Sequence, residues 1–435
     1  MNEIIGYSQN VLYITIAIGI ALSIAKPKIL AYLSIIYFSA RNQLEAIFTR
    51  TSLFGPYLNL DDAVIVCLII AFFVNGIKTG FRKAIIPKYT IVIIITIFIG
   101  LVIVYLKYDI TYEVLRETRG AFNFPIIIIL FANFIENEED ARKLLLLSIS
   151  GSILASLQYF YYIYTSRGEI VIDNYGQLRL IQYISICPYL IAFSMLIDFD
   201  KIDIKLKTLI WIALPLSILN LLFSQTRSIN IAVAISFLFL SIILYKGKNI
   251  LSSKLLFISF VLLISFIIFN QFFSWIDFNE ILYGRMSSLT EQKDKDYTTY
   301  ARLLAVKYEL SEFLNSSLVF GNGIGYTNFS PLAYDEEIGW GHIGPVAYLS
   351  RLGLVGFFLY YFYIPYFNFK MSNSLFRKYK TGYIHYFSVF TLCIILLDWI
   401  SFHMSASYLS PGVINSAIYL GALYRINYEN SKIKG

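Results

Sequence analysis

Charged residues are scarce in this chain of 435 residues: Asp, Glu, Lys and Arg make up 14% of it, whereas 57% of it is hydrophobic. Together with a mean hydropathy of +0.66, this composition excludes a soluble globular domain, in which about 25% of residues are charged. Apolar stretches of about 15–25 residues recur along the chain, and a helix needs roughly 20 residues to cross a bilayer. The composition therefore predicts a polytopic integral membrane protein.

Cysteine is rarer still, and it gives no support for a disulfide framework or a metal site. Cys67, Cys187 and Cys393 all fall within apolar runs, where cysteine behaves as a small apolar residue. Alternating polarity, which marks the strands of a transmembrane barrel, is missing from runs such as 91–95. A basic segment at the N-terminus is also missing, so we expect no removable signal peptide. The fold class predicted is all-α.

The hydrophobic pattern predicts twelve to fourteen transmembrane helices in three parts. Residues 1–275 form N-terminal spans, residues 276–343 a large extracytoplasmic loop with an amphipathic helix, and residues 344–435 C-terminal spans. Arg41 interrupts the second span early, so that segment could instead be re-entrant or interfacial. The expected spans are approximately 7–25, 29–40, 62–77, 90–106, 124–136, 144–164, 181–198, 208–224, 228–245, 255–275, 344–367, 383–400 and 411–425.

Basic residues orient these spans, because short cytoplasmic loops retain Lys and Arg. One face carries 17 Lys and 4 Arg, and the remaining 14 basic residues are 10 Arg and 4 Lys. The lysine-rich face is predicted to be cytoplasmic, with the C-terminus on it and the large loop outside. The outer preference for arginine favours an anionic ligand there, since guanidinium binds phosphate oxygens in a bidentate manner. The alternative is that these arginines snorkel from helix ends.

Two arginines lead the candidates for binding such an anion. Arg227 lies in the short connection 224–228, which places its guanidinium at the outer membrane surface unless it is only an interfacial anchor. Arg302 opens a segment in which apolar residues recur at helical spacing, as in an amphipathic helix along the membrane. Tyr300, two residues earlier, is a further candidate for substrate binding.

The segment that follows contains glycines, a histidine and another arginine. The motif 321–325, Gly-Asn-Gly-Ile-Gly, lacks the strand and helix of a dinucleotide site, so we expect a flexible turn. His342 precedes Gly344-Pro345, which predicts the start of a span, and a neutral imidazole there could accept a proton from a sugar hydroxyl. A structural histidine is the alternative. Arg351 lies roughly 10 Å deeper and should face a cavity or the bundle interior.

Several other polar residues are weaker candidates. Arg179 leads a group of outer arginines that could extend the site, and His403 and Asp398, near the outer end of a late span, are as consistent with structural as with functional roles. Asp294-Lys295-Asp296 has the form of a metal-binding D-x-D motif, but its charged surroundings favour a solvated loop. The remaining outer arginines of this group are Arg116 and Arg119.

The order of these motifs resembles the O-antigen ligase/polymerase superfamily, which includes Wzy-type polymerases of bacterial surface polysaccharides. The resemblance rests on Thr226-Arg227-Ser228, Arg302 before the glycine motif, and His342 before the span containing Arg351. It covers about residues 208–360 and is only topological before them. It implies a fold of the lipid-dependent glycosyltransferase (GT-C) type and a site facing the periplasm from the bacterial inner membrane.

The resemblance also implies a reaction. An undecaprenyl-pyrophosphate-linked oligosaccharide would be the donor and a second lipid-linked glycan the acceptor, without metal or cofactor and with inversion of the anomeric centre. Arg227 and Arg302 would neutralise the departing pyrophosphate, and His342 would orient or deprotonate the attacking hydroxyl. This agrees with the chemistry, since a good leaving group chiefly needs fixed positive charge in a low-dielectric site. The implied partners are the bilayer and, as candidates, a chain-length regulator and a flippase, but no nucleic acid.

Two other readings stay open. A ligase would differ only in using a lipid A core as acceptor, and the sequence does not identify the acceptor. A membrane transporter, bicarbonate-like or a flippase for lipid-linked glycans, would typically show ionisable residues at mid-membrane, broken helices and repeats. The sequence has no charge near the centre of a predicted span and no evident repeat, although Pro215 is a candidate kink.

Overall fold

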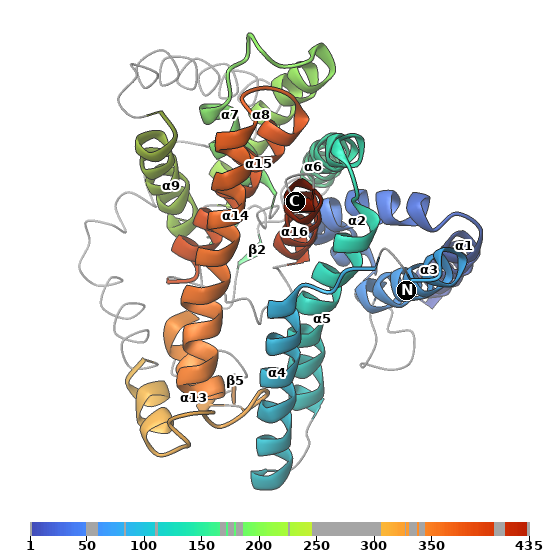
Figure 1. The fold of residues 1–435 in the computed structure, drawn as a ribbon. Helices are drawn as coiled ribbons and strands as arrows, with labels where there is room; N and C mark the ends of the chain where they lie inside the picture. Colours follow the sequence, from blue (N-terminus) through green and yellow to red (C-terminus); the bar gives the residue numbers. More distant parts are fainter. Residues whose placement is uncertain are drawn as a thin grey trace.

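The structure is a computed structural model, and its described residues are almost entirely helical (Figure 1). It describes residues 2–48, 60–81, 84–108, 112–165, 171–172, 178–179, 186–224, 227–245, 306–326, 328–329, 337–338, 344–403 and 414–432. The predicted all-α class is confirmed for this part of the chain. The first helices are α1 (Asn2–Ala25), α2 (Pro27–Phe48), α3 (Leu60–Thr79), α4 (Lys88–Lys107), α5 (Tyr112–Phe134) and α6 (Glu138–Thr165).

The later elements are mainly helices, with two pairs of short strands among them. They are α7 (Cys187–Leu196), α8 (Ile204–Ser224), α9 (Arg227–Tyr245), a helix over 306–314, α13 (Gly344–Phe357), the π-helix η2 (Phe358–Tyr363), α14 (Ile364–Lys378), α15 (Tyr383–Ser401) and α16 (Ile414–Lys432). Four strands of two residues form two antiparallel pairs: β2 (Val171–Ile172) with β3 (Leu178–Arg179), and β4 (Asn328–Phe329) with β5 (Glu337–Ile338).

Six helices of the described part are long and apolar enough to cross a membrane. They are α3, α4, Glu138–Tyr161, Ile204–Leu221, the stretch Gly344–Lys378, which comprises α13, η2 and α14 and has a kink at Gly353, and α15. Shorter apolar helices accompany them at Tyr13–Ala25, Pro27–Ala40, Cys187–Leu196 and Ile229–Leu244. A membrane-spanning protein is thereby confirmed, and α2 continues through Arg41 as one helix. The span predicted at 255–275 lies outside the described residues.

The core is built around α15 and α16. Nearly every residue of α15 is buried, and a helix that is apolar all round belongs inside a bundle. Figure 1 shows α16 between α5, α6 and α14, and it packs most closely on α5. A Cβ on Gly421 would lie 2.4 Å from the Ile128 carbonyl oxygen, so glycine is what allows α16 and α5 to approach this closely.

The lysine-rich connections meet at one end of the bundle. Lys28 Nζ lies 2.8 Å from Asp140 Oδ2, which joins the α1–α2 connection to the start of α6. The Tyr383 hydroxyl donates to Asp203 at 2.8 Å, and the Tyr383 backbone N–H donates to Glu138 at 3.0 Å. The α5–α6, α7–α8 and α14–α15 connections are therefore in contact with one another.

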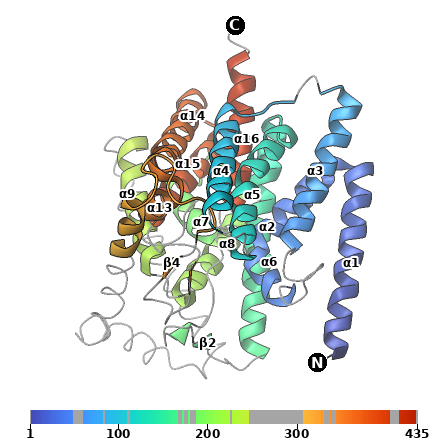
Figure 2. The same cartoon turned by 90° about the horizontal axis from the view of Figure 1, so that it is seen from below.

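The C-terminal helix ends at this same basic end. Lys378 Nζ donates to Asn430 Oδ1 at 2.9 Å, which ties the end of α14 to the end of α16. Figure 2 shows the C-terminus at one end of the bundle and the N-terminus at the other. The predicted grouping of basic connections on one face is confirmed for these elements.

Candidate functional site

The predicted site residues differ in how far the structure describes them. Side chains are described for Arg119 on α5 and Arg351 on α13. Backbone alone is described for Arg116 on α5, Arg179 on β3, opposite Val171, and Arg227, the first residue of α9. Arg302, Tyr300, His342, Asp294 and Asp296 lie outside the described residues.

The candidate arginines named above belong to elements that start at the end opposite the basic connections. Helices α5, α7 and α14 each finish at the basic end, and α8 begins there. By chain order, the starts of α5, α9 and α13 and the β2–β3 pair that precedes α7 therefore belong to the other end. We call this the arginine end. Its segments come from four separate parts of the chain.

A polar segment, residues 306–326, packs against α4, α5 and α13 at this end through its glycines. A Cβ on Gly321 would lie 2.6 Å from the Arg351 carbonyl carbon, one on Gly323 2.4 Å from the Gly100 oxygen, and one on Gly325 2.5 Å from Val114 Cα. All three glycines also have positive φ, which side chains with a Cβ rarely adopt. The expectation of a flexible turn needs correction: the turn exists, but close packing against three helices is what requires its glycines.

Helix α13 is interrupted where this segment meets it, a feature that the sequence analysis did not predict. Gly353 has φ 63° and ψ −161°, so the backbone hydrogen bonds of α13 cannot continue across it. Four bonds replace them, from Leu354 N–H to Leu318 O (3.0 Å), Val355 N–H to Val319 O (3.2 Å), Asn322 N–H to Ser350 O (2.8 Å) and Gly323 N–H to Arg351 O (2.8 Å). We call these four bonds the clasp.

The clasp has a clear physical basis. A backbone N–H or C=O left unpaired in an apolar setting costs several kcal/mol, and a break in a membrane-spanning helix leaves both kinds. The segment 318–323 supplies two carbonyls and two N–H groups to the break. The broken helix and the segment 318–323 therefore satisfy each other's backbone hydrogen-bonding groups.

Arg351 lies beside the clasp in a buried cluster of charges. It is 2% exposed, which confirms that it faces the interior, and its Nη1 lies 3.5 Å from Glu117 Oε2. Glu309, on the 306–314 helix, is 6% exposed. Burial raises the pKa of the Glu309 carboxyl to about 7, and the attraction of Arg351 offsets this only in part. Burial thus favours the protonated form of Glu309.

Neither acidic residue of this cluster was predicted. Glu309 did leave a signal, because it is three residues after Val306 and four before Phe313, on the apolar side of the predicted helix. Glu117 stands between Arg116 and Thr118 with nothing to mark it. Its partner is 234 positions away in the chain, and only the packing of α5 near α13 brings them together.

A second ion pair lies nearer the start of α3. Arg119 Nη1 is 3.0 Å from Asp62 Oδ2, and the neighbouring Asp61 accepts a bond of 2.8 Å from the Tyr37 hydroxyl. Both predicted substrate-binding arginines with described side chains therefore already contact carboxylates. An anion would have to compete with those carboxylates, and binding of substrate by Arg119 or Arg351 stays a prediction.

Tyrosines secure the end of the polar segment to α4. The Tyr326 hydroxyl donates to Glu312 Oε2 at 2.8 Å, and the Tyr326 ring lies 5.0 Å from that of Tyr108, just beyond α4. Asn322 Nδ2 donates to the Glu312 carbonyl at 3.3 Å. Side-chain contacts thus reinforce the docking that the glycines permit.

Asp398 and His403, the weaker candidates, both have defined protein partners. Asp398 accepts hydrogen bonds from the Tyr189 hydroxyl, at 2.6 Å, and from Ser416. His403 Nδ1 lies 2.8 Å from the Trp399 carbonyl, which can only accept, so Nδ1 carries the proton. Nε2 then accepts from the hydroxyl of Tyr361.

The end of α15 also meets the start of α13. The Gly344 N–H donates to the Phe402 carbonyl at 2.8 Å, which joins the residue before His403 to the first residue of α13. This contact, like the clasp, ties the first turns of α13 to other elements. The span start predicted at Gly344-Pro345 is confirmed.

The chemistry available at the arginine end is that of charge and proton transfer. Within the described ranges no group of three or more His, Cys, Asp or Glu side chains is placed to hold a metal ion. The described site consists of the ion pairs of Arg119 and Arg351, the Glu309 carboxyl with its raised pKa, and the segment 318–323 fixed by backbone hydrogen bonds. Searches of protein-family models and of curated proteins found no match to this chain.

Proposed function

We propose that the protein is a glycosyltransferase of the O-antigen ligase/polymerase type that polymerises a bacterial surface polysaccharide. The donor is a glycan linked to undecaprenyl pyrophosphate, and the acceptor is the non-reducing end of a second lipid-linked unit. The observation that supports this most is that Arg119 and Arg351 lie on helices that pack against residues 306–326 at one end of a membrane-spanning bundle. The active site belongs at this end, facing the periplasm.

The proposed reaction forms one glycosidic bond and breaks one. A hydroxyl oxygen of the acceptor sugar attacks the anomeric carbon, the bond to the pyrophosphate oxygen breaks, and the hydroxyl proton passes to His342. Arg227 and Arg302 stabilise the charge that develops on the departing pyrophosphate, an effect that is large in a site with little water. Each arginine is expected to lower the activation barrier by about 3 kcal/mol, which corresponds to roughly a hundredfold in rate.

Purified protein incubated with a lipid-linked repeat unit provides the test. Polymer formed from this single substrate supports a polymerase, whereas product that appears only after lipid A core is added would show a ligase. The variants Arg227→Ala, Arg302→Ala and His342→Ala should each lose about a hundredfold or more in rate while inserting normally. Arg377→Ala, an exposed arginine at the basic end, is the matched control and should keep full activity. Normal polymer from all three variants would refute the assignment.

A transporter is the second candidate, because one structural observation favours it. The break at Gly353, with the buried Arg351 and its partner Glu117 beside it, matches the discontinuous helices and paired charges of secondary transporters. Proteoliposomes distinguish the two functions. Movement of bicarbonate or of a lipid-linked glycan across the vesicle membrane, without glycosidic bond formation, would favour transport.

A further inference from the structure

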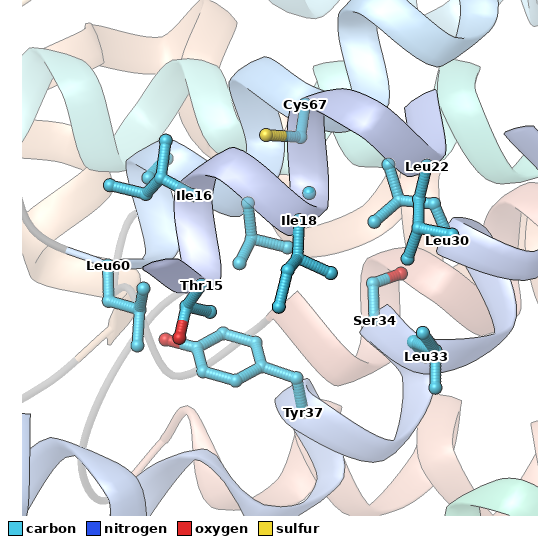
Figure 3. Close-up of a pocket in the computed structure, with 13 residues that line it drawn as sticks. Thr15, Ile16, Ile18, Leu22, Leu30, Leu33, Ser34, Tyr37, Leu60 and Cys67 are labelled. Carbon is cyan, nitrogen blue, oxygen red and sulfur yellow. The ribbon is translucent and has the colours of Figure 1, made fainter. Parts of the chain in front are cut away.

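A cavity of about 150 Å³ lies between α1, α2 and α3 (Figure 3), and its lining residues all fall between Thr15 and Cys67. Its wall is apolar, with Ile18 and Leu22 from α1, Leu33 from α2, and Val64 and Cys67 from α3. Apolar cavities of about this size stay dry and take up molecules of about six carbon atoms. The walls thus select for hydrocarbon.

The few polar groups in the wall are already engaged. The Ser34 hydroxyl donates to the Ala31 carbonyl at 2.8 Å, and the Tyr37 hydroxyl donates to Asp61 at 2.8 Å. Thr15, whose hydroxyl lies near that of Tyr37 in Figure 3, also has an interaction partner. A polar ligand would gain little from such a wall, because its own groups would lose water without replacement.

The cavity opens sideways, between α1 and α2. Ile18 and Leu33 both line it, yet they are 54% and 47% exposed. At the other side α1 and α3 are in close contact, since a Cβ on Gly19 would lie 3.0 Å from Cys67 Sγ. Exposed apolar side chains of α1 and α2 flank this opening, and both helices accompany the apolar spans, so we place the opening against the bilayer, where hydrocarbon chains are the surrounding solvent.

Charge near the cavity distinguishes between lipids. Leu60 and Tyr37 of the lining adjoin Asp61 and Asp62; Asp61 accepts from the Tyr37 hydroxyl, and Asp62 pairs with Arg119. These two carboxyls disfavour an anionic headgroup beside them. A polyprenyl pyrophosphate is therefore a poor occupant, and a zwitterionic phospholipid a suitable one.

We propose that this groove binds one acyl chain of a zwitterionic glycerophospholipid as a structural lipid. The chain fills the gap between α1 and the α2–α3 pair, which are the elements that α1 chiefly contacts. Dispersion contacts with the wall replace those that an empty cavity would forgo. This binding is independent of the glycosyl transfer proposed above.

Native mass spectrometry of the full chain, extracted from phosphatidylethanolamine-rich membranes in mild detergent, tests this proposal. The wild type should retain one phospholipid. Ala63→Leu, which fills the groove from α3, should reduce its occupancy about tenfold. Ala17→Leu is the matched control, because Ala17 is an exposed residue of α1 outside the lining. Equal occupancy in both variants, retention of a polyprenyl phosphate instead, or no retained lipid in the wild type would each overturn the proposal.

Cys67 provides a second measurement on the unaltered protein, should Ala63→Leu fail to fold. An N-alkylmaleimide should modify Cys67 about ten times faster after delipidation, and added phosphatidylethanolamine should restore protection. Cys187, buried elsewhere, serves as the internal control when modification is read by peptide mass spectrometry. A Cys67 rate that is indifferent to lipid would contradict the proposal independently of any variant.

Discussion

The backbone N–H of Gly323 donates to the carbonyl oxygen of Arg351 across a break in a membrane-spanning helix, at 2.8 Å. On its other side, Gly323 lies against Gly100 of α4, where a Cβ on Gly323 would lie 2.4 Å from the Gly100 oxygen. Docking of the polar segment therefore depends on a position where no side chain fits. This dependence can be measured.

Gly323→Ala should release the segment 318–326 from α4 and α13. Its Cβ would lie 2.4 Å from the Gly100 oxygen, at φ +100°, so the turn must move, at a cost of about 2–3 kcal/mol. Gly382→Ala is the matched control, because Gly382 also has positive φ, but its Cβ would meet only the end of the Glu138 side chain. Thermal unfolding should show a clearly larger drop in Tm for Gly323→Ala than for Gly382→Ala. Equal drops in Tm would mean that backbone conformation alone matters.

Glu117→Gln should lower the free energy of unfolding more than removal of the whole ion pair does. It leaves the Arg351 guanidinium buried with less compensating charge, which costs about 3–5 kcal/mol. The double variant Glu117→Met, Arg351→Met removes both charges and should recover most of that stability. Together with the single variants Glu117→Met and Arg351→Met, it forms a double-mutant cycle whose unfolding free energies give the coupling. Additive effects of the two single substitutions would show that the pair contributes nothing specific.

Stability should fall as the pH rises through the range set by Glu309. Its carboxyl has a pKa of about 7 in the fold against 4.5 as the ordinary value, so the folded state binds more protons between these limits. The free energy of unfolding then decreases from about pH 4.5 to about pH 7, by on the order of 3 kcal/mol. Glu309→Gln should flatten this dependence, with unfolding followed at several pH values. An unchanged slope in the variant would assign the effect to other groups.

Membrane orientation can be tested with single introduced cysteines. The three native cysteines are buried, so background labelling by an impermeant maleimide should be low. Asn315→Cys, exposed on the polar segment, should react from outside intact spheroplasts, and Thr381→Cys, exposed at the basic end, only after lysis. The reverse pattern would invert the predicted topology.

Features that depend on local composition could be predicted from the sequence. Apolar runs gave the helices, and the lysine-rich connections did prove to share one end, where Lys28 meets Asp140 and Tyr383 meets Asp203. Pro345 correctly indicated the first turn of α13. These properties arise from neighbouring residues and from the bilayer, so no knowledge of tertiary contacts is needed.

The clasp and its charge cluster could not be predicted in this way. Gly353 resembles any glycine in an apolar helix until Leu318 and Val319 are known to lie against it. Likewise, Glu117 becomes meaningful only once α5 packs near Arg351. The glycine motif suggested freedom of movement, because glycine serves both loose turns and close packing, and only the neighbouring backbone distinguishes the two.

The break in α13 also ties this helix to a segment synthesised before it. If it kept this break, a helix that entered the bilayer alone would carry two unpaired N–H groups and two unpaired carbonyls at residues 350–355, and each costs several kcal/mol in hydrocarbon. Residues 318–323, synthesised about thirty positions earlier, supply the missing partners. The broken form of α13 therefore depends on the segment, and in a chain cut between them α13 should close into a regular helix.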